Sequence, residues 1–585
     1  MAVAKTAERQ RRHRERPQPS EGAEPRNGHA HTAVAEGAVN SILGPNPFIG
    51  LDTQKVVQST GQLLGRLSRR PRAALSIGVE AVAEISKVVL GRSKVGPAKG
   101  DKRFTDPAWA DHPGYHRLMQ SYLVLGSALH NLVPVAELDA TNALRADFAV
   151  TMLDEAFAPT NAFWSNPAVQ KRAYDTAGLS MLRGIRNFAK DVVQNGGMPT
   201  MIDTRPFKVG ENIAATPGAV VYRDELCEVI QYRPSTETVH ERPLVMIPPQ
   251  INKYYILDLA KERSLTEFMV AQGIQFFTIA WRNPTPEQRD LGLDSYVESC
   301  MAAMNVACEI TGSEDCNLLG VCAGGVTMAA LLGHLAATKQ KRVNSATFGV
   351  TVLDTKAPSM IGMFATEKSV ALAIRKSRAA GCLDGRDMSR VFAWLRPTDL
   401  VWNYWVNNYL LGNDPPAFDI LYWNGDNTRL TAALHRDFLE LWVANALAKP
   451  GALKVLGTPI DLTKVKCETY VVAGATDHIA PWKAAYSTTQ MLGGPTQFVL
   501  SSSGHIQSLV NPAGNPKASY LAGGPMEGTA PAWLRGAKEN RDSWWTHWAS
   551  WLGKRSGDRR PASDKLGSKQ HPPTDAAPGR YVHVK

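Results

Sequence analysis

The stretch LLGVCAGGVTMAALLG, residues 318–333, decides the fold of this 585-residue chain. Its apolar start is typical of the end of a buried strand, and the residues from Val326 to Ala337 are typical of a helix. Glycines flank Cys322 in the pattern Gly-x-Cys-x-Gly, because a nucleophile on a tight strand-to-helix turn leaves no room for neighbouring side chains. The stretch therefore predicts a thiol that projects from the end of a buried strand.

The uncharged run around this motif is long enough to raise the question of a membrane span. No Asp, Glu, Lys or Arg occurs from Cys316 to Thr338. The adjacent Gly324 and Gly325 would weaken a lipid-exposed helix, so a strand, a turn and a helix are favoured over one span. Residues 1–30 are polar and Arg-rich without an apolar core, and we predict no secretory signal peptide there.

Length and composition indicate a large globular protein of a reducing cytoplasm. With 44% hydrophobic residues, the chain can bury an extensive core in two or more structural units. The seven cysteines are widely spread and form no CxxC pair, which argues against a zinc site and against a disulfide framework. We therefore expect neither a metal nor a bound cofactor.

The net charge of +11 is concentrated near the two ends of the chain. Residues 41–105 hold eleven basic and four acidic residues, whereas residues 106–552 sum to −3. Solvated basic ends and a contact with an anionic surface both fit this distribution. Nothing in the sequence resembles a nucleic-acid-binding motif, and we expect no nucleic acid as a partner.

The chain divides into a helical part and a mixed part between two polar ends. Residues 1–45 and 553–585 contain few large apolar residues, and both are predicted to be disordered tails. Residues 46–205 show apolar residues at helical spacing and are predicted to form an N-terminal helical domain. Residues 206–552 alternate short β-branched runs with helical stretches, which indicates a mostly parallel sheet covered on both faces.

Six apolar runs of the mixed part are predicted to be strands. More than a hundred residues separate the fourth run from the fifth, too many for a simple crossover. This insert, about residues 355–465, is rich in Trp and Tyr and is predicted to be a cap domain over the carboxyl edge of the sheet. The six runs are residues 243–247, 274–280, 316–321, 345–353, 469–474 and 496–502.

The order of candidate partners behind Cys322 predicts an α/β-hydrolase fold, in which nucleophile, acid and histidine follow one another along the chain. Asp477 follows the fifth predicted strand, and His505 lies 28 residues later on a Gly-containing loop after the sixth. Asp354, after the fourth strand, is the rival acid, and the strand order favours Asp477 over it. His478 is interpreted as a neighbour of the acid loop, and three further histidines between Cys322 and the predicted C-terminal tail lie in helices or in the insert.

Backbone N–H groups are the expected donors to an oxyanion. One is that of Ala323, which directly follows the nucleophile, and the second is that of Ile251, in the loop after the first predicted strand. The six other cysteines are expected to be small buried apolar residues.

Several long segments resemble the polyhydroxyalkanoate synthases. The resemblance runs from about residue 100 to 550 and matches the long, single-subunit types (I and II) of that family. The family's nucleophile, acid and base correspond to Cys322, Asp477 and His505, while both ends of the chain depart from the family's pattern. The segments are PPQINKYYILDL, AWRNPTPEQRDLGLDSYV, GVCAGG, VWNYWVNNYLLGNDPPAFDILYWN, ATDHIAPW and SSSGHIQSLVNP.

The resemblance implies an acyltransferase that polymerises (R)-3-hydroxyacyl-CoA into a polyester and releases CoA, which is part of the substrate rather than a cofactor. A cysteine suits this reaction, since it exchanges one thioester for another and keeps the acyl group activated. His505 would take the proton of Cys322 and later that of the attacking 3-hydroxyl, while Asp477 orients it. The amino-acid sequences of the insert and of the His505 loop resemble more those of family members that use medium-chain monomers.

The resemblance also implies partners and a location. A homodimer on polyester granules in the cytoplasm is expected, with the growing polyester chain as a further partner. The basic, amphipathic segment 41–105 would contact a granule, a granule-coating protein or a second subunit. Two other readings stay open: a cysteine-nucleophile hydrolase of the dienelactone hydrolase type, and a granule-associated scaffold without activity.

Overall fold

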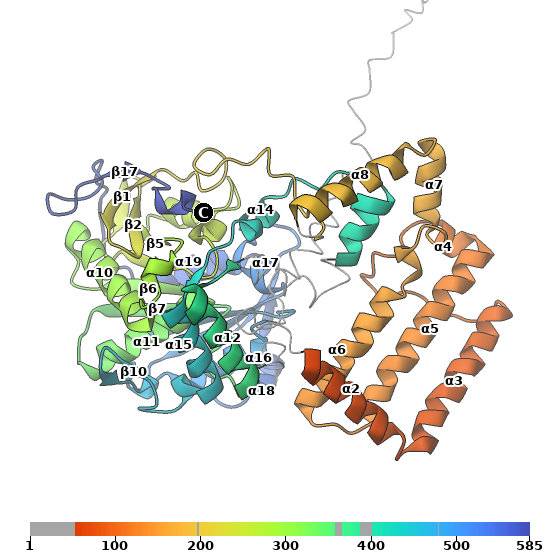
Figure 1. The fold of residues 1–585 in the computed structure, drawn as a ribbon. Coiled ribbons are helices and arrows are strands. Elements are labelled where there is room, and N and C mark those ends of the chain that lie inside the picture. Colours follow the sequence, from red (N-terminus) through yellow and green to blue (C-terminus); the bar gives the residue numbers. More distant parts are fainter. Residues whose placement is uncertain (1–52, 196–197, 357–364, 386–400, 478) are drawn as a thin grey trace, which may run out of the picture.

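A computed structural model provides the structure of the chain (Figure 1). It describes residues 53–195, 198–356, 365–385, 401–477 and 479–585. The predicted tail 1–45 and His478 lie outside the described residues. Among the helices described, none combines the length and the apolar character that a membrane crossing needs.

An eleven-stranded sheet forms the centre of the described chain, in the order β15-β14-β13-β12-β7-β6-β4-β5-β2-β1-β17. The six strands from β13 to β5 are parallel, and the strands outside them are antiparallel. The strands are β1 Gly218–Arg223, β2 Cys227–Tyr232, β4 Leu244–Ile247, β5 Phe276–Trp281, β6 Cys316–Val321, β7 Val343–Gly349, β12 Glu468–Gly474, β13 Thr496–Ser501, β14 Tyr520–Ala522, β15 Lys538–Asn540 and β17 Asp575–Ala576.

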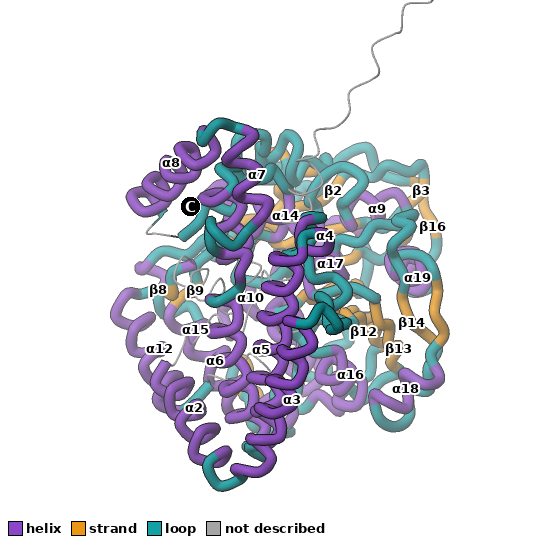
Figure 2. The backbone as a smooth tube through the Cα atoms, turned by 90° about the vertical axis from the view of Figure 1, so that its right-hand side faces the viewer, coloured by secondary structure: helices purple, strands orange, loops and turns teal. Residues whose placement is uncertain are grey.

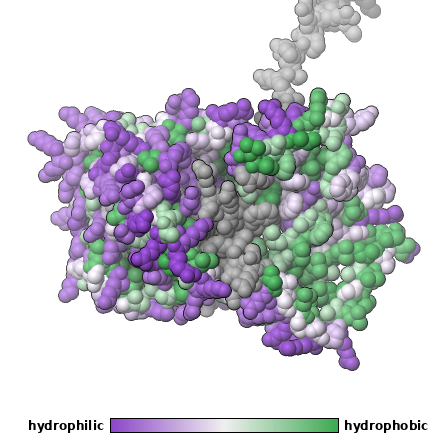
Figure 3. Space-filling model, in the orientation of Figure 1, coloured by the Kyte–Doolittle hydropathy of each residue, from purple (hydrophilic) through white to green (hydrophobic). Residues whose placement is uncertain are grey.

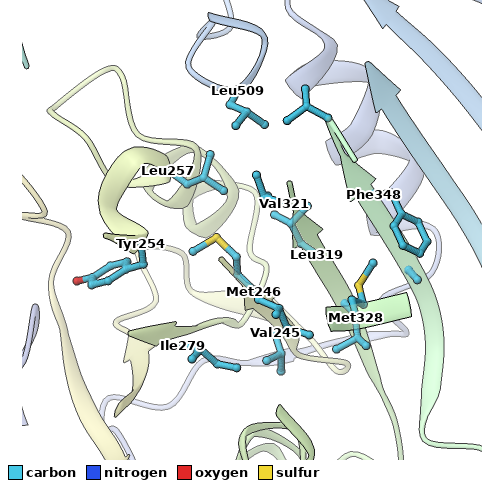
Figure 4. Packing of buried hydrophobic residues seen from close by; sticks show 14 of the residues in the cluster. Val245, Met246, Tyr254, Leu257, Ile279, Leu319, Val321, Met328, Phe348 and Leu509 are labelled. Atoms are coloured by element: carbon cyan, nitrogen blue, oxygen red, sulfur yellow. The ribbon is translucent and has the colours of Figure 1, made fainter. Parts of the chain in front are cut away.

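The six predicted strands are confirmed as β4, β5, β6, β7, β12 and β13. Their residues are almost all buried because helices cover both faces of the sheet. Side chains alternate between the faces: Thr347 of β7 accepts a hydrogen bond from the indole of Trp548 (2.9 Å), while Gly320 of β6 lies against Met328 on the other face. Figure 4 shows Met328 beside the apolar side chains of the central strands.

Two pairs of helices make these covering layers. On one face α10 packs against α11, and on the other α9 packs against α19, where the rings of Phe268 and Trp545 are 5.6 Å apart. Further helices follow β12, β13 and β14. The bounds are α9 Leu265–Ala271, α10 Leu293–Thr311, α11 Ala323–Ala337, α16 Trp482–Met491, α17 His505–Leu509, α18 Ala530–Gly536 and α19 Trp544–Gly553.

The insert between β7 and β12 lies only partly at the carboxyl edge of the sheet. Thr428 donates a hydrogen bond to the carbonyl of Gln250, in the loop after β4 (2.7 Å), whereas Ile460 packs against Gly333, near the far end of α11. The described elements are α12 Glu367–Ala380, β8 Cys382–Leu383, η6 Trp405–Leu410, α14 Asp419–Gly425, β9 Leu430–Thr431, α15 Ala432–Ala444, η7 Ala446–Ala448, β10 Lys454–Val455, β11 Thr458–Pro459 and η8 Leu462–Lys464.

The N-terminal part is a group of helices that stand side by side next to the insert (Figure 2). Its last helix docks on η6: the hydroxyl of Tyr409 donates to the carboxylate of Asp191 (2.8 Å), and Asn187 donates to the carbonyl of Asn408 (3.1 Å). The helices are α2 Thr53–Leu67, α3 Pro71–Val89, α4 Ala108–Asp111, α5 Pro113–Val135, α6 Ala140–Ala156, α7 Pro167–Asp175 and α8 Leu179–Gln194.

The prediction of a disordered tail at 553–585 is wrong. This segment forms β16 (Arg559–Pro561), which pairs with β3 (Thr238–His240), and then β17, which extends the main sheet beside β1. It ends in η9, Tyr581–His583, and the C-terminus lies against the sheet domain (Figure 1). The order comes from backbone pairing along exposed strand edges, which requires hydrogen-bond partners rather than many apolar side chains.

Candidate active site

Cys322 lies at the turn between β6 and α11 in a strained conformation, with φ 50° and ψ −120°. A side chain at Gly320 would come within 2.8 Å of the Cα of Gly325, and one at Gly324 within 2.2 Å of the carbonyl oxygen of Ile247. Only glycine fits at these two positions, since Gly320 packs against α11 and Gly324 against the end of β4. The predicted tight turn from strand to helix at Cys322 is therefore present.

His505 and Asp477 form a buried pair, joined by a hydrogen bond of 2.6 Å between Nδ1 of His505 and Oδ2 of Asp477. The other carboxylate oxygen accepts the backbone N–H groups of Ile479 and Ala480, each at 2.9 Å. Asp477 follows β12 and His505 follows β13, so two adjacent parallel strands deliver them to one edge. The imidazole is thereby fixed in one orientation.

The pair also sets the charge of the histidine. Burial lowers the pKa of His505, but the charge of Asp477, its hydrogen bond and the side chain of Cys322 outweigh burial and raise this pKa to about 10. Nε2 of His505 has no hydrogen-bond partner of normal geometry among the described residues, and the Cys322 side chain is near enough to contribute to the raised pKa of the imidazole.

The rival residues have other partners. Asp354 accepts a hydrogen bond from the side chain of Asn445 in the insert (2.8 Å), and the structure pairs His505 with Asp477 instead. Four of the described histidines behind Cys322 are engaged elsewhere: His334 with a carbonyl of β10, His435 with Ser377, His547 with Tyr470 and His571 with Glu309. His583 is exposed in the C-terminal segment.

The two predicted oxyanion donors lie on adjoining segments. Ala323 is the first residue of α11, where a backbone N–H has no acceptor within the helix. Ile251 is buried in the loop after β4, and the neighbouring Gln250 donates to the hydroxyl of Thr327 on α11 (3.0 Å). The loop is thus tied to the N-terminal part of α11, the helix that follows Cys322.

The other cysteines differ from Cys322 in their surroundings. All are buried except Cys467, which is partly exposed. Burial raises the pKa of Cys467 to about 11, so little of it is thiolate near neutral pH. Within the described residues, no group of three or more His, Cys, Asp or Glu side chains could hold a metal ion.

Sequence reasoning missed Lys253, which lies two residues after Ile251. Its ammonium is buried and donates to the backbone carbonyls of Val584 (2.8 Å) and Tyr581 (3.4 Å) in the C-terminal segment. A lysine inside the otherwise uncharged run PPQINKYYIL was the available signal, because a buried charge requires partners.

Comparisons with known proteins agree with this architecture. Residues 100–269 match the family described as "Poly-beta-hydroxybutyrate polymerase (PhaC) N-terminus", and residues 261–512 match "alpha/beta hydrolase fold". "Poly(3-hydroxyalkanoate) polymerase 1" of Ectopseudomonas oleovorans is 46% identical over 94% of this chain and 98% of its own length. The chain belongs to the poly(3-hydroxyalkanoate) polymerase family.

Further members of this polymerase family are similar along most of their length. "Poly(3-hydroxyalkanoate) polymerase 2" of the same organism is 45% identical over 92% of this chain and 96% of its own. "Poly(3-hydroxyalkanoate) polymerase subunit PhaC" of Cupriavidus necator is 37% identical over 92% of this chain and 91% of its own. The resemblance to the long-type polymerases and the α/β-hydrolase fold are both confirmed.

Proposed function

We propose that this polymerase converts (R)-3-hydroxyacyl-CoA into polyhydroxyalkanoate with release of CoA, through acyl thioesters on Cys322. Family membership identifies it as an acyltransferase-type enzyme that polymerises hydroxyacyl-CoA. The observation that carries the assignment of residues is the buried His505–Asp477 pair beside the thiol on the elbow.

In the first step the sulfur of Cys322 attacks the thioester carbonyl of the substrate. The backbone N–H groups of Ala323 and Ile251 stabilise the oxyanion that forms. When the bond between the carbonyl carbon and the CoA sulfur breaks, the imidazolium of His505 donates its proton to the departing thiolate. The products are acyl-Cys322, free CoA and a neutral His505.

In the second step the 3-hydroxyl of another hydroxyacyl unit attacks the acyl-Cys322 carbonyl. His505 takes the hydroxyl proton, an ester bond forms, and the carbon–sulfur bond to Cys322 breaks to restore the thiolate and the imidazolium. Asp477 keeps the imidazole oriented and stabilises its positive charge in both steps. The steps use only side chains and groups of the substrate, and we propose that no cofactor takes part.

Water competes with the hydroxyl in the second step, and the outcome separates a polymerase from a cysteine hydrolase. Purified protein is supplied with (R)-3-hydroxybutyryl-CoA or (R)-3-hydroxyoctanoyl-CoA, and CoA release, chloroform-soluble polyester and free hydroxy acid are measured. We expect polyester to account for most of the CoA released. Stoichiometric free acid from both substrates would support the hydrolase instead.

Variants at the site test the roles. Wild-type protein should release CoA, which would exclude an inactive scaffold. Cys322→Ala should abolish this release. Asp477→Asn should lower kcat by about 10⁴, as loss of the orienting carboxylate does in other triads. The matched control is Asp354→Asn, which should retain most activity; the reverse result would assign the acid to Asp354.

We also propose that the enzyme works as a homodimer on the surface of polyester granules in the cytoplasm, alone or with a granule-coating protein. The N-terminal helices support this, because many of their apolar side chains are exposed: Leu75, Val79 and Val82 on α3 are 67%, 59% and 68% exposed. Figure 3 shows apolar residues gathered over this part of the molecule. Such a surface suits contact with an apolar polymer.

A further inference from the structure

The C-terminal segment reaches the loop that carries Ile251. After β17, the backbone N–H groups of Arg580 and Tyr581 donate to the carboxylate of Glu228 on β2, at 3.0 and 2.9 Å. The ring of Tyr581 lies under the guanidinium of Arg282, 5.5 Å from its centroid. These contacts carry the last residues of the chain across the end of β5 to the loop after β4.

At that loop the segment makes two polar connections. The ammonium of Lys253 donates to the carbonyl of Val584 at 2.8 Å, and the ammonium of Lys585 forms an ion pair with Asp426 of the insert at 2.6 Å. Asp426 in turn accepts a hydrogen bond from the hydroxyl of Tyr255 (2.9 Å). The segment therefore contacts Lys253 directly, and it connects to Tyr255 through Asp426 of the insert.

The same loop has contacts on its opposite side that lead to the nucleophile. Gln250 donates to Thr327 on α11, and the indole of Trp281 donates to the carbonyl of Pro248 (2.9 Å). Ile251 thus lies between a contact with the nucleophile helix and Lys253, which the tail holds. The insert holds the loop as well, since Thr428 donates to the carbonyl of Gln250 (2.7 Å) and the indole of Trp423 donates to the carbonyl of Lys253 (2.6 Å). Because an oxyanion donor must be placed within fractions of an ångström, loss of the contact with the tail would make the loop less effective even with these contacts in place.

We propose that residues Tyr581–Lys585 are a clamp that holds the loop after β4, and with it the backbone N–H of Ile251, in position for acyl transfer. Lys253 is the positioning residue that connects the clamp to the loop. The inference rests on the proposed function, since it assigns Ile251 to the oxyanion of that reaction. It gives the C-terminal segment a part in the chemistry without contact with the substrate.

The test compares acyl transfer with alkylation of the same thiol. Both Lys253→Met and deletion of Val584 and Lys585 should lower kcat for CoA release about tenfold or more, because an oxyanion donor is displaced. Alkylation of Cys322 by iodoacetamide, measured against Cys322→Ala as the blank, should stay within about twofold, since it forms no carbonyl oxyanion. Lys569→Ala, at an exposed position of the same C-terminal segment outside the clamp, is the matched control and should leave kcat unchanged.

The effects of the two changes should not add, so that kcat of a protein with both should fall no further than kcat of either single variant. The proposal is overturned if kcat stays within about twofold of wild type, or if alkylation falls by the same factor as CoA release, which would place the defect in the triad or the fold. A rise in KM at constant kcat would make the segment a substrate-binding element instead. Wild-type protein that releases no CoA would refute the proposed function, whereas wild-type release with unaffected variants refutes the clamp alone.

Discussion

The helix α3 and the C-terminal segment 553–585 lie near opposite ends of the chain and use their side chains in opposite ways. The amphipathic α3 leaves Leu75, Val79 and Val82 exposed, although its composition resembles that of a core helix. The C-terminal segment has few large apolar residues, yet it pairs with two strand edges and buries Val582.

The difference shows that apolar content and order are separate properties. A helix satisfies its own backbone hydrogen bonds, so it can present an apolar face to a partner without losing its structure. An edge strand obtains order from the unpaired N–H and C=O groups of its neighbour, with little need for apolar side chains. Ion pairs such as those between Arg223 and both Glu228 and Asp575 add to that pairing.

The largest expected effect is that of deleting residues 558–585. Removal of β16, β17 and η9 leaves β3 without its partner strand, exposes the outer edge of β1 and uncovers Glu228, so we expect loss of soluble, active protein. Deletion of residues 1–40 is the matched control and should leave specific activity unchanged, because that segment lacks the apolar content to pack. The yield of soluble protein and CoA release check both. A fully active protein after the C-terminal deletion would show that the fold does not need the strand pairing of the C-terminal segment.

A smaller effect is expected from Glu228→Ala. Glu228 is fully buried and accepts hydrogen bonds from Arg223 and from the N–H groups of Arg580 and Tyr581. Its removal leaves the two N–H groups without their acceptor and leaves Arg223 with only Asp575 of its two carboxylate partners, and should lower the free energy of unfolding by about 3 kcal/mol. Denaturant titration measures this, with the exposed Glu225→Ala as control. Equal midpoints for the two variants would show that the C-terminal segment contributes little to stability.

The pH dependence of stability tests whether the amine of Lys253 is buried in the clamp. Burial lowers the pKa of Lys253 from 10.5 to about 8; Asp426 opposes this, while Lys585 and Arg429 add to it. Between these values the unfolded chain binds more protons at Lys253 than the folded chain, so raising the pH favours folding. Relative to Lys253→Met, the wild type should gain up to about 3 kcal/mol from pH 8 to 10.5. If the difference in free energy of unfolding between the two proteins did not change with pH, the amine of Lys253 would be solvent-exposed rather than buried.

The smallest effect on stability is expected from a triple exchange on α3, Leu75→Gln, Val79→Gln and Val82→Gln. These side chains are exposed, and glutamine is a good helix former, so each exchange should change stability by about 0.5 kcal/mol or less. Binding to polyester particles should nevertheless weaken. Val88→Gln, at a fully buried position of the same helix, is the control and should destabilise the protein. Unchanged particle binding by the triple variant would remove the proposed role of this surface.

Much of the fold and site could be predicted because the signals are local. All six predicted strands were found within a few residues, since runs buried on both faces are continuously apolar. Cys322, Asp477 and His505 were located because each follows the end of a strand, and parallel strands bring such ends to one edge. The outer strands β1, β2, β14, β15 and β17 were missed. The last three have only two or three residues each, and their pairing rather than their composition makes them strands.

The amino-acid sequence by itself determined the family, the glycines around Cys322 and the chain order of the candidate residues Cys322, Asp477 and His505, because these depend on residue types at fixed spacings. Only the tertiary structure decided that His505 pairs with Asp477 rather than Asp354, and that the last residues of the chain return to Lys253. Those contacts join residues that are 28 and 331 positions apart in the chain. No local pattern encodes such a contact, since it depends on how the whole sheet brings distant segments together.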